Sequence, residues 1–137
     1  MERTLQQTNS NCIKVVLFGP ESTGKSTLAK ELADHYNSIY VEEYAREYLQ
    51  KKYDLNQEIC SYNDLIPIAK GQIRLENKAS KKCNSILFCD TDLLTTKIYS
   101  EIYFDKCDPL INEYAIKNKY DLYLLMDVDI PWVKDDL

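Results

Sequence analysis

The stretch Ile13-Lys-Val-Val-Leu-Phe-Gly19-Pro-Glu-Ser-Thr-Gly24-Lys-Ser-Thr-Leu28 decides the fold of this 137-residue chain. Its first six residues form an apolar, β-rich run that is typical of a buried strand. The run stops at Gly19, and residues 25–36 carry the helix formers and spaced apolar positions of an amphipathic helix. A buried strand, a glycine-bearing loop and a helix in direct succession predict the first unit of a parallel α/β fold.

The loop itself matches the pattern Gly-x-x-x-x-Gly-Lys-Ser of a phosphate-binding loop. Glycines let backbone N–H groups curl inward into an anion nest, and the following helix adds the positive end of its dipole. Lys25 is then expected to reach the β- and γ-phosphates of ATP, and the Ser26 hydroxyl to ligate Mg²⁺. The alternative is a glycine turn with an incidental Lys-Ser. The residues predicted to bind Mg-ATP are Gly19, Pro20, Glu21, Ser22, Thr23, Gly24, Lys25, Ser26 and, as a weaker hydroxyl candidate, Thr27.

Strand and helix patterns alternate along the rest of the chain. Further strands are expected at 38–41, 86–89 and 122–126, and helices at 42–53, 61–83, 91–104 and 108–117. Pro67 and Gly71 interrupt one of these helical patterns and predict a kink or a break there. The alternation predicts a largely parallel sheet sandwiched by helices, with the strand C-termini at one ligand-binding edge. We expect residues 1–11 to form a flexible leader and residues 12–137 to form one domain.

Carboxylates follow two of the expected strands. Asp90 ends the run 86–89, the position at which phosphate-loop proteins carry the Asp that holds Mg²⁺, and Asp92 is placed to share the metal or to contact substrate. Alternatively, both aspartates only cap the next helix. Glu43 and Arg46 are spaced i, i+3, so they form either a surface ion pair or part of a site. In that site a carboxylate, either Glu43 or Asp90, accepts the proton of an attacking hydroxyl, and Arg46 steadies a phosphate.

Composition excludes several classes of function. The formal net charge is −5 and the small basic cluster at 78–82 is typical of a solvated helix end, which argues against a nucleic acid partner. Five cysteines without a CxxC pair, and a single histidine, argue against structural zinc. No apolar run approaches 18 residues and no secretory signal is present, so we expect no membrane partner and a reduced, cytoplasmic location. No pattern specifies an oligomeric state.

Four segments together resemble the ribosylnicotinamide kinase domain of NadR-type proteins, within the superfamily of phosphate-loop kinases. Their order and spacing match over nearly the whole chain from about Val15. The segments are Gly19-Pro-Glu-Ser-Thr-Gly-Lys-Ser-Thr27, Glu43-Tyr-Ala-Arg-Glu47, Cys89-Asp-Thr-Asp92 with Thr95-Thr96, and Trp132-Val-Lys-Asp-Asp-Leu137. The loop alone is unspecific, whereas the four segments together are fairly specific.

The resemblance implies a phosphate-loop kinase fold with parallel strand order 2-3-1-4-5. It also implies that ATP phosphorylates the 5′-hydroxyl of a nucleoside, nicotinamide riboside, on the way to NAD. The expected catalytic residues are Lys25, Asp90 and Glu43. The resemblance further places the metal at Ser26 and Asp90, and the nucleoside at Glu43, Tyr44, Arg46 and Asp92.

The chain departs from the family pattern in two places. Glu42 stands where a better-known member has an aromatic residue beside the Glu-Tyr pair. The family also continues beyond the segment 132–137 into an arginine-bearing lid and a last strand, so we expect a domain that is incomplete at its C-terminus. Because kinases use cationic groups to neutralise the transferring phosphoryl, two other functions stay open. One is a non-catalytic ATP-binding regulatory module, and the other is an AAA-like ATPase, for which no arginine finger is recognisable.

Overall fold

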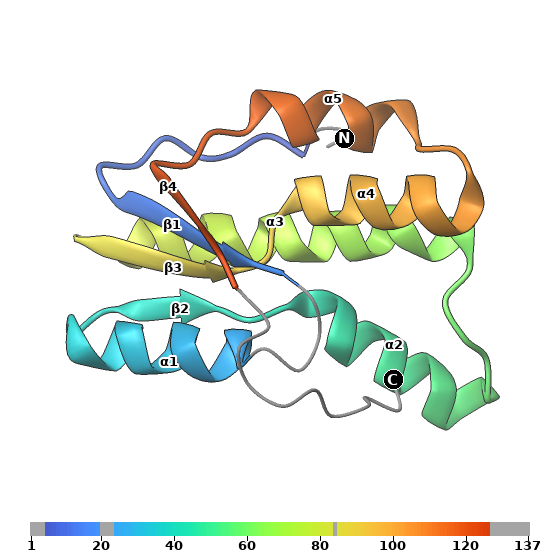
Figure 1. Ribbon diagram of the computed structural model, residues 1–137, viewed down its shortest axis with the longest axis horizontal. Helices are drawn as coiled ribbons and strands as arrows, with labels where there is room; N and C mark the ends of the chain where they lie inside the picture. Colours follow the sequence, from blue (N-terminus) through green and yellow to red (C-terminus); the bar gives the residue numbers. More distant parts are fainter. Residues whose placement is uncertain (1–4, 20–23, 84, 127–137) are drawn as a thin grey trace.

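The computed structural model describes residues 5–19, 24–83 and 85–126, and within these ranges four parallel strands form one sheet. The strands are β1 (Ile13–Phe18), β2 (Ile39–Val41), β3 (Ile86–Asp90) and β4 (Leu122–Leu125). They are hydrogen-bonded in the order β2-β3-β1-β4 (Figure 1), which agrees with the first four strands of the expected order 2-3-1-4-5. Leu17 pairs with both Asp90 and Leu124, so the strands end at a common edge.

Helices cover both faces of the sheet (Figure 1). The described helices are α1 (Lys25–His35), α2 (Tyr44–Asn56), the short 3₁₀ helix η1 (Tyr62–Asp64), α3 (Leu65–Lys82), α4 (Leu93–Phe104) and α5 (Pro109–Lys117). Of these, α1 packs on one face of the sheet and α3 on the other. Val15 and Leu17 pack against α1 on one face, whereas Val16 packs on the α3 face. Because consecutive residues of β1 are buried on opposite faces, the strand needs the continuous apolar run seen in the sequence.

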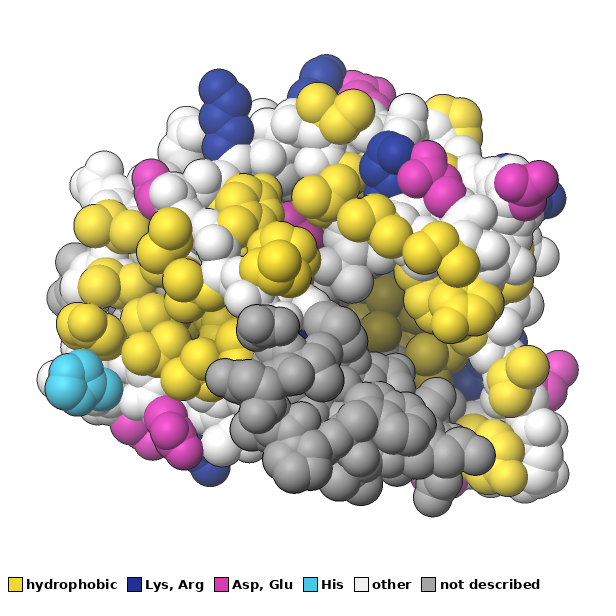
Figure 2. Space-filling model, viewed as in Figure 1, with side chains coloured by type: hydrophobic (Ala, Val, Ile, Leu, Met, Phe, Trp, Pro, Cys, Tyr) yellow, Lys and Arg dark blue, Asp and Glu magenta, His cyan; other side chains and the backbone are white. Residues whose placement is uncertain are grey.

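A second apolar core lies between helices α3, α4 and α5. Its buried members are Leu5, Leu65, Ile68, Ala69, Ile73, Leu93, Ile111 and Ala115. Other apolar side chains stay exposed. Figure 2, which has the same view as Figure 1, shows many of them where Figure 1 draws the strands. Leu122 and Leu125 of β4 are among these exposed residues. Within the described part of the chain, no helix combines the length and apolarity needed to cross a membrane.

The expected kink or break at Pro67 and Gly71 is wrong, because α3 runs without interruption from Leu65 to Lys82. Pro67 lies in the first turn, where a missing N–H costs no intrahelical hydrogen bond. Gly71 is needed for packing, since a Cβ there would lie 2.1 Å from Cε2 of Tyr44. The glycine therefore allows the ring of Tyr44 to lie directly on the backbone of α3.

The expectation of a flexible leader is wrong for residues 5–11. Leu5 is fully buried, and its carbonyl oxygen accepts a hydrogen bond from Nδ2 of Asn118 at 3.1 Å. Nε2 of Gln7 donates to the Glu76 carboxylate at 2.9 Å. The polar side chains that suggested a solvated leader instead find partners on α3 and after α5.

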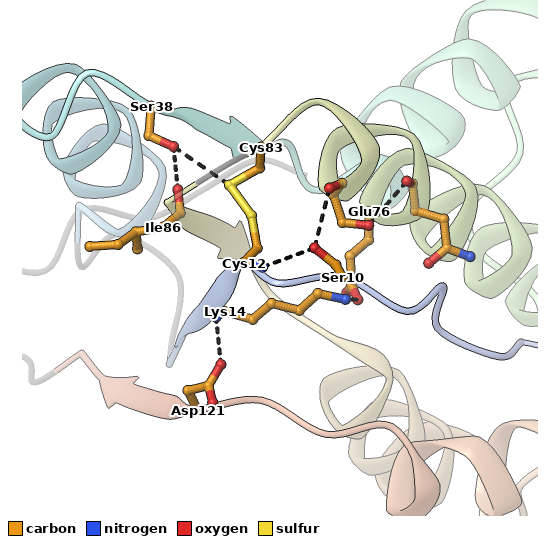
Figure 3. Close-up of a disulfide and its surroundings, with 10 residues drawn as sticks. Ser10, Cys12, Lys14, Ser38, Glu76, Cys83, Ile86 and Asp121 are labelled. Carbon is orange, nitrogen blue, oxygen red and sulfur yellow. Dashed lines mark hydrogen bonds and ion pairs between the residues drawn. A yellow bond between two sulfur atoms is a disulfide. The ribbon is translucent and has the colours of Figure 1, made fainter.

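The cysteines are not all reduced thiols, contrary to expectation. Cys12 and Cys83 form a disulfide, whereas Cys60, Cys89 and Cys107 are free. The disulfide joins the residue before β1 to the C-cap of α3 (Figure 3).

Candidate functional site

Two glycines bound the predicted phosphate loop. Gly19 follows β1 with φ +147°, and Gly24 forms the N-cap of α1 with φ +80°. A Cβ at Gly19 would lie 2.9 Å from the carbonyl oxygen of Met126, so both the backbone angle and the space require glycine. Residues 20–23 lie outside the described part of the chain, so the predicted contacts of Pro20, Glu21, Ser22 and Thr23 stay predictions.

The first turn of α1 faces the end of this loop. It carries no acidic side chain, and its N-cap is a glycine that has no side chain to cap with. Helical hydrogen bonding begins where the Leu28 N–H donates to the Gly24 carbonyl at 2.9 Å. The N–H groups before that point carry the positive end of the helix dipole and suit an anion. Thr27 is exposed on the same turn.

Lys25 contacts two carboxylates, one that follows strand β2 and one that ends strand β3. Its Nζ lies 3.3 Å from Oε2 of Glu43 and 3.2 Å from Oδ1 of Asp90. Glu43 follows β2 as the N-cap residue of α2, and Asp90 is the last residue of β3. The fold thus brings the three predicted catalytic residues together from three separate elements, at the edge where strands end.

Asp90 also binds the hydroxyl of Ser26. The Ser26 Oγ donates to Oδ2 of Asp90 at 2.5 Å, and the aspartate is 2% exposed. Its other oxygen, Oδ1, lies within ion-pair distance of Lys25 but makes no hydrogen bond among the described residues. We call Lys25, Ser26, Glu43 and Asp90 the site cluster.

The donor atoms of the site cluster fit Mg²⁺. A serine hydroxyl and a carboxylate in contact are hard oxygen donors, and Mg²⁺ commonly takes one or two carboxylates together with phosphate oxygens and waters. Within the described ranges no group of three or more His, Cys, Asp and Glu side chains is arranged to hold a metal ion. Phosphate and water would therefore have to complete the coordination around Ser26 and Asp90.

Asp92 caps the next helix. Its Oδ1 accepts hydrogen bonds from the backbone N–H of Thr95 at 3.3 Å and from the Thr95 hydroxyl at 3.4 Å. Burial raises the pKa of the Asp92 carboxyl above its usual value, which these hydrogen bonds partly offset. Burial, followed by the charge of Asp92, raises the pKa of Tyr123 to about 12. Asp92 therefore has the capping role that the sequence left open, and its contact with substrate stays a prediction.

The substrate-side segment after β2 is held by α3. Oε1 of Gln72 accepts a hydrogen bond from the Tyr44 N–H at 2.8 Å, while its Nε2 donates to the Glu42 carbonyl at 3.0 Å. Gln72 thereby fixes the backbone on both sides of Glu43. Arg46 is exposed in the first turn of α2.

Sequence reasoning missed three residues beside the site. Gln72 lies mid-helix and Tyr123 mid-strand, where nothing in the pattern distinguishes them. Thr91 has φ +79°, which is uncommon for a β-branched residue, and its buried hydroxyl has no hydrogen-bond partner in the described structure. The only feature of the sequence that points to Thr91 is its position between Asp90 and Asp92.

The parallel sheet with a glycine loop after β1, Lys25 and Ser26 at the start of α1, and an aspartate at the end of β3 define a phosphate-loop nucleotide-binding protein. The order of its four described strands is that of the phosphate-loop kinases that the sequence resembles. Residues 14–137 match the family described as AAA domain, and the chain belongs to that family.

NadR proteins are among the relatives of this chain. The chain is 32% identical over 123 residues to the trifunctional NAD biosynthesis/regulator protein NadR of Salmonella typhimurium, covering 90% of this chain but 30% of that protein. A crystal structure of NadR protein in complex with NR matches with a TM-score of 0.73 at 30% identity, over 83% of this chain and 33% of that one. A second, in complex with NAD and AMP-PNP, matches with a TM-score of 0.69 at 28% identity, over 83% and 34%. The chain thus spans about a third of the length of these relatives.

Proposed function

We propose that this chain binds Mg-ATP at the β1–α1 loop and transfers the γ-phosphate to the 5′-hydroxyl of nicotinamide riboside, a step in NAD biosynthesis or salvage. The observation that carries the proposal is the placement of Lys25 between Asp90 and Glu43, with Ser26 on Asp90. The similarity to NadR, whose structures hold NR or AMP-PNP, supports this choice of acceptor and donor.

The ATP side of the proposal uses Lys25, Ser26 and the α1 N-terminus. Without nucleotide, the Lys25 ammonium is neutralised by Asp90 and Glu43. A triphosphate tail competes for that ammonium and also accepts from the first-turn N–H groups. Ser26 and Asp90 would hold Mg²⁺, which supplies charge neutralisation at the phosphates.

Exposure supports different roles for the two carboxylates. The side chain of Asp90 is 2% exposed and is engaged by both Ser26 and Lys25, whereas the Glu43 side chain is 21% exposed. Once Lys25 turns toward phosphate, Glu43 regains an acceptor oxygen that an incoming hydroxyl can reach. This supports Glu43 as the group that accepts the hydroxyl proton and Asp90 as the metal-holding group.

A cavity beside α2 shares Tyr44 with the proposed acceptor side, although none of the site cluster lines it. It has a volume of about 330 Å³, and Tyr44, Tyr48, Lys52 and Asp64 are among its lining residues. That volume is at the lower end of small-molecule sites. We propose that Tyr44, Arg46 and Asp92 contribute contacts to the nucleoside, with Tyr44 already fixed by its packing on Gly71.

A product assay tests the proposal. The full chain is incubated with ATP, Mg²⁺ and a panel of nucleosides, and phosphorylated products are identified by mass spectrometry. Product from nicotinamide riboside, lost in Lys25→Ala, supports the kinase. ATP binding without any product would instead indicate a regulatory module, and ADP formation that is independent of acceptor would indicate an AAA-like ATPase.

A further inference from the structure

Residues 5–12 form a strap along one face of α3, which we call the N-terminal strap. Its partners on α3 recur at helical spacing, at positions 76, 77, 80 and 83, so they share a face of the helix. The hydrogen bonds run from Gln7 to Glu76 (2.9 Å), from Asn77 to the Gln6 carbonyl (3.0 Å), from the Thr8 N–H to Asn77 (2.9 Å), and from Ser10 to the Ser80 carbonyl (3.3 Å). The disulfide at Cys83 continues this row as a covalent contact.

The two cysteines are held close by contacts other than their own bond. The Ile13 N–H, next to Cys12, donates to the Ser85 carbonyl at 2.9 Å, and Ile13 pairs with Ile86 in the sheet. On the other side of Cys12, its own N–H donates to the Ser10 hydroxyl at 3.0 Å. The Cα atoms of the pair lie 6.1 Å apart, within the usual range for a disulfide (Figure 3). Opening the bond therefore leaves both thiols positioned to close it again.

The pair also lies within reach of a small reagent. Cys83 is partly exposed and Cys12 is 8% exposed. The Ser38 hydroxyl lies 3.9 Å from the Cys83 sulfur and also contacts the Ile86 carbonyl (Figure 3). By contrast, Cys89 is buried in the sheet, and burial raises the pKa of its thiol well above the usual value. A reagent therefore reaches the disulfide at the partly exposed Cys83 sulfur, while Cys12 packs in the same buried cluster as Cys89.

We propose that Cys12 and Cys83 form a reversible thiol–disulfide clasp on the N-terminal strap, with glutathione or a dithiol as its redox partner. A thiolate of the reductant attacks one sulfur, forms a mixed disulfide and releases the other cysteine as a thiolate that takes up a proton. A second reductant thiol then displaces the remaining cysteine. Two electrons and two protons pass to the cysteine pair, and the reductant ends as its disulfide. Closure is the reverse, with oxidised glutathione or an oxidised dithiol as the acceptor.

The clasp controls stability and leaves the site cluster unchanged. Closing it links residues separated by 71 positions, which restricts the unfolded chain. Between Cys12 and Gly19, β1 is paired with β3 on one side and with β4 on the other. The hydrogen bonds of that pairing hold the strand in both redox states. We therefore expect reduction to lower Tm by about 5–15 °C and to change the Kd for Mg-ATP by less than about twofold.

Cysteine counting tests the clasp. The chain is treated with oxidised glutathione, freed of it, denatured without reductant and alkylated with iodoacetamide, and the labels are counted by mass spectrometry. We expect three labels from the free cysteines, and five after prior reduction with dithiothreitol. Peptide mapping should find residues 12 and 83 in one cross-linked pair. Five labels after oxidation, or a cross-link through Cys60, Cys89 or Cys107, overturns the proposal.

Matched variants separate the clasp from a general effect of cysteine replacement. Cys12→Ser and Cys83→Ser should each melt at the temperature of the reduced protein and lose the response of Tm to dithiothreitol. Cys107→Ser, at a partly exposed free cysteine, should keep that response and give two labels before reduction and four after it. A dithiothreitol response that persists in Cys12→Ser refutes the clasp. Because Mg-ATP binding is measured separately, failure of the clasp and failure of the proposed kinase are distinguishable.

Discussion

Two lysines, one near the start of β1 and one at the start of α1, make ion pairs that differ in their exposure to solvent. Near the start of β1, Nζ of Lys14 lies 3.0 Å from Oε2 of Glu76, and at the start of α1 Lys25 lies 3.3 Å from Glu43. The side chains of the first pair are 8% and 2% exposed, and those of the second are 13% and 21% exposed. The first pair is closed to solvent, whereas the second is open on the carboxylate side.

Hydrogen bonding sharpens the contrast. Glu76 accepts from Lys14, from Gln7 at 2.9 Å and from the Tyr120 hydroxyl at 2.5 Å, so both of its oxygens are engaged. We call these four residues the Glu76 cluster. In the site cluster, Oδ1 of Asp90 has an ion partner but no hydrogen bond within the described ranges. A satisfied buried network stabilises the fold, while an incompletely satisfied one at a strand edge is suited to a ligand.

Replacing Glu76 with Gln should produce the largest effect on stability. The amide keeps the size of the side chain but leaves the buried Lys14 ammonium without its counter-charge, which costs about 3–5 kcal/mol when a buried pair is broken. Urea denaturation followed by circular dichroism measures the loss. The double variant Lys14→Met/Glu76→Leu should recover much of it. A loss below about 1 kcal/mol for Glu76→Gln would mean that the cluster is not structural.

Lys25→Ala should lower the affinity for Mg-ATP strongly and the free energy of unfolding to a smaller extent. Losing a charged partner for phosphate costs about 1.5–3 kcal/mol, so the affinity for Mg-ATP should fall about 10- to 100-fold. Its effect on the free energy of unfolding should be smaller than that of Glu76→Gln, because the buried Asp90 carboxylate keeps the Ser26 hydroxyl as a partner and Glu43 is partly exposed. Isothermal titration calorimetry and urea denaturation on the same sample measure both quantities. Wild-type affinity in Lys25→Ala would remove the distinction between the two clusters.

The sequence predicts the site cluster better than the Glu76 cluster, for a physical reason. Lys25 and Ser26 follow a glycine loop with fixed spacing, and Asp90 ends an apolar strand, so local patterns suffice. Glu76 lies on a helix with ordinary amphipathic spacing, and its three partners come from distant parts of the chain. Such a network depends on how α3 is rotated against the sheet, which no local pattern states.

The errors have the same origin. Residues 5–11 are polar and predicted a flexible leader, yet their polar groups meet a complementary face of α3. Gly71 predicted a helix break. The sequence does not show that the Tyr44 ring packs on this glycine, because that contact depends on how α2 packs against α3. The pairing of Cys12 with Cys83 spans 71 positions and follows from strand register. In each case tertiary contacts override local propensity.

Gly71→Ala should affect both stability and the site. The new Cβ would lie 2.1 Å from the Tyr44 ring, and overpacking of this kind costs about 1–3 kcal/mol. Because Tyr44 follows Glu43, moving the ring should also shift Glu43 relative to Lys25 and lower turnover more than ATP affinity. Unfolding free energies in a double-mutant cycle with Tyr44→Ala measure the coupling. If Gly71→Ala costs as much without the ring as with it, the clash is not the cause.

The smallest expected effect concerns the hydroxyl of Tyr123, for which Tyr120 of the Glu76 cluster is the comparison. Burial raises the pKa of Tyr120 well above its usual value, and it raises that of the more exposed Tyr123 to about 12. A raised folded-state pKa means that the native protein holds the proton more tightly than the unfolded chain does. Stability from Tyr123 is therefore fully present below pH 10 and is lost as pH rises toward 12.

Tyr123→Phe isolates this contribution. Since Tyr123 is 40% exposed, solvent screening reduces the effect to about 1 kcal/mol. Chemical denaturation at several pH values from 9 to 12 should show wild type losing that much more stability than the variant as pH rises. Tyr120→Phe serves as the comparison, because it removes a donor to the buried Glu76 carboxylate and should destabilise the protein already at pH 7. Identical pH profiles for wild type and Tyr123→Phe would show that folding does not raise the pKa of Tyr123.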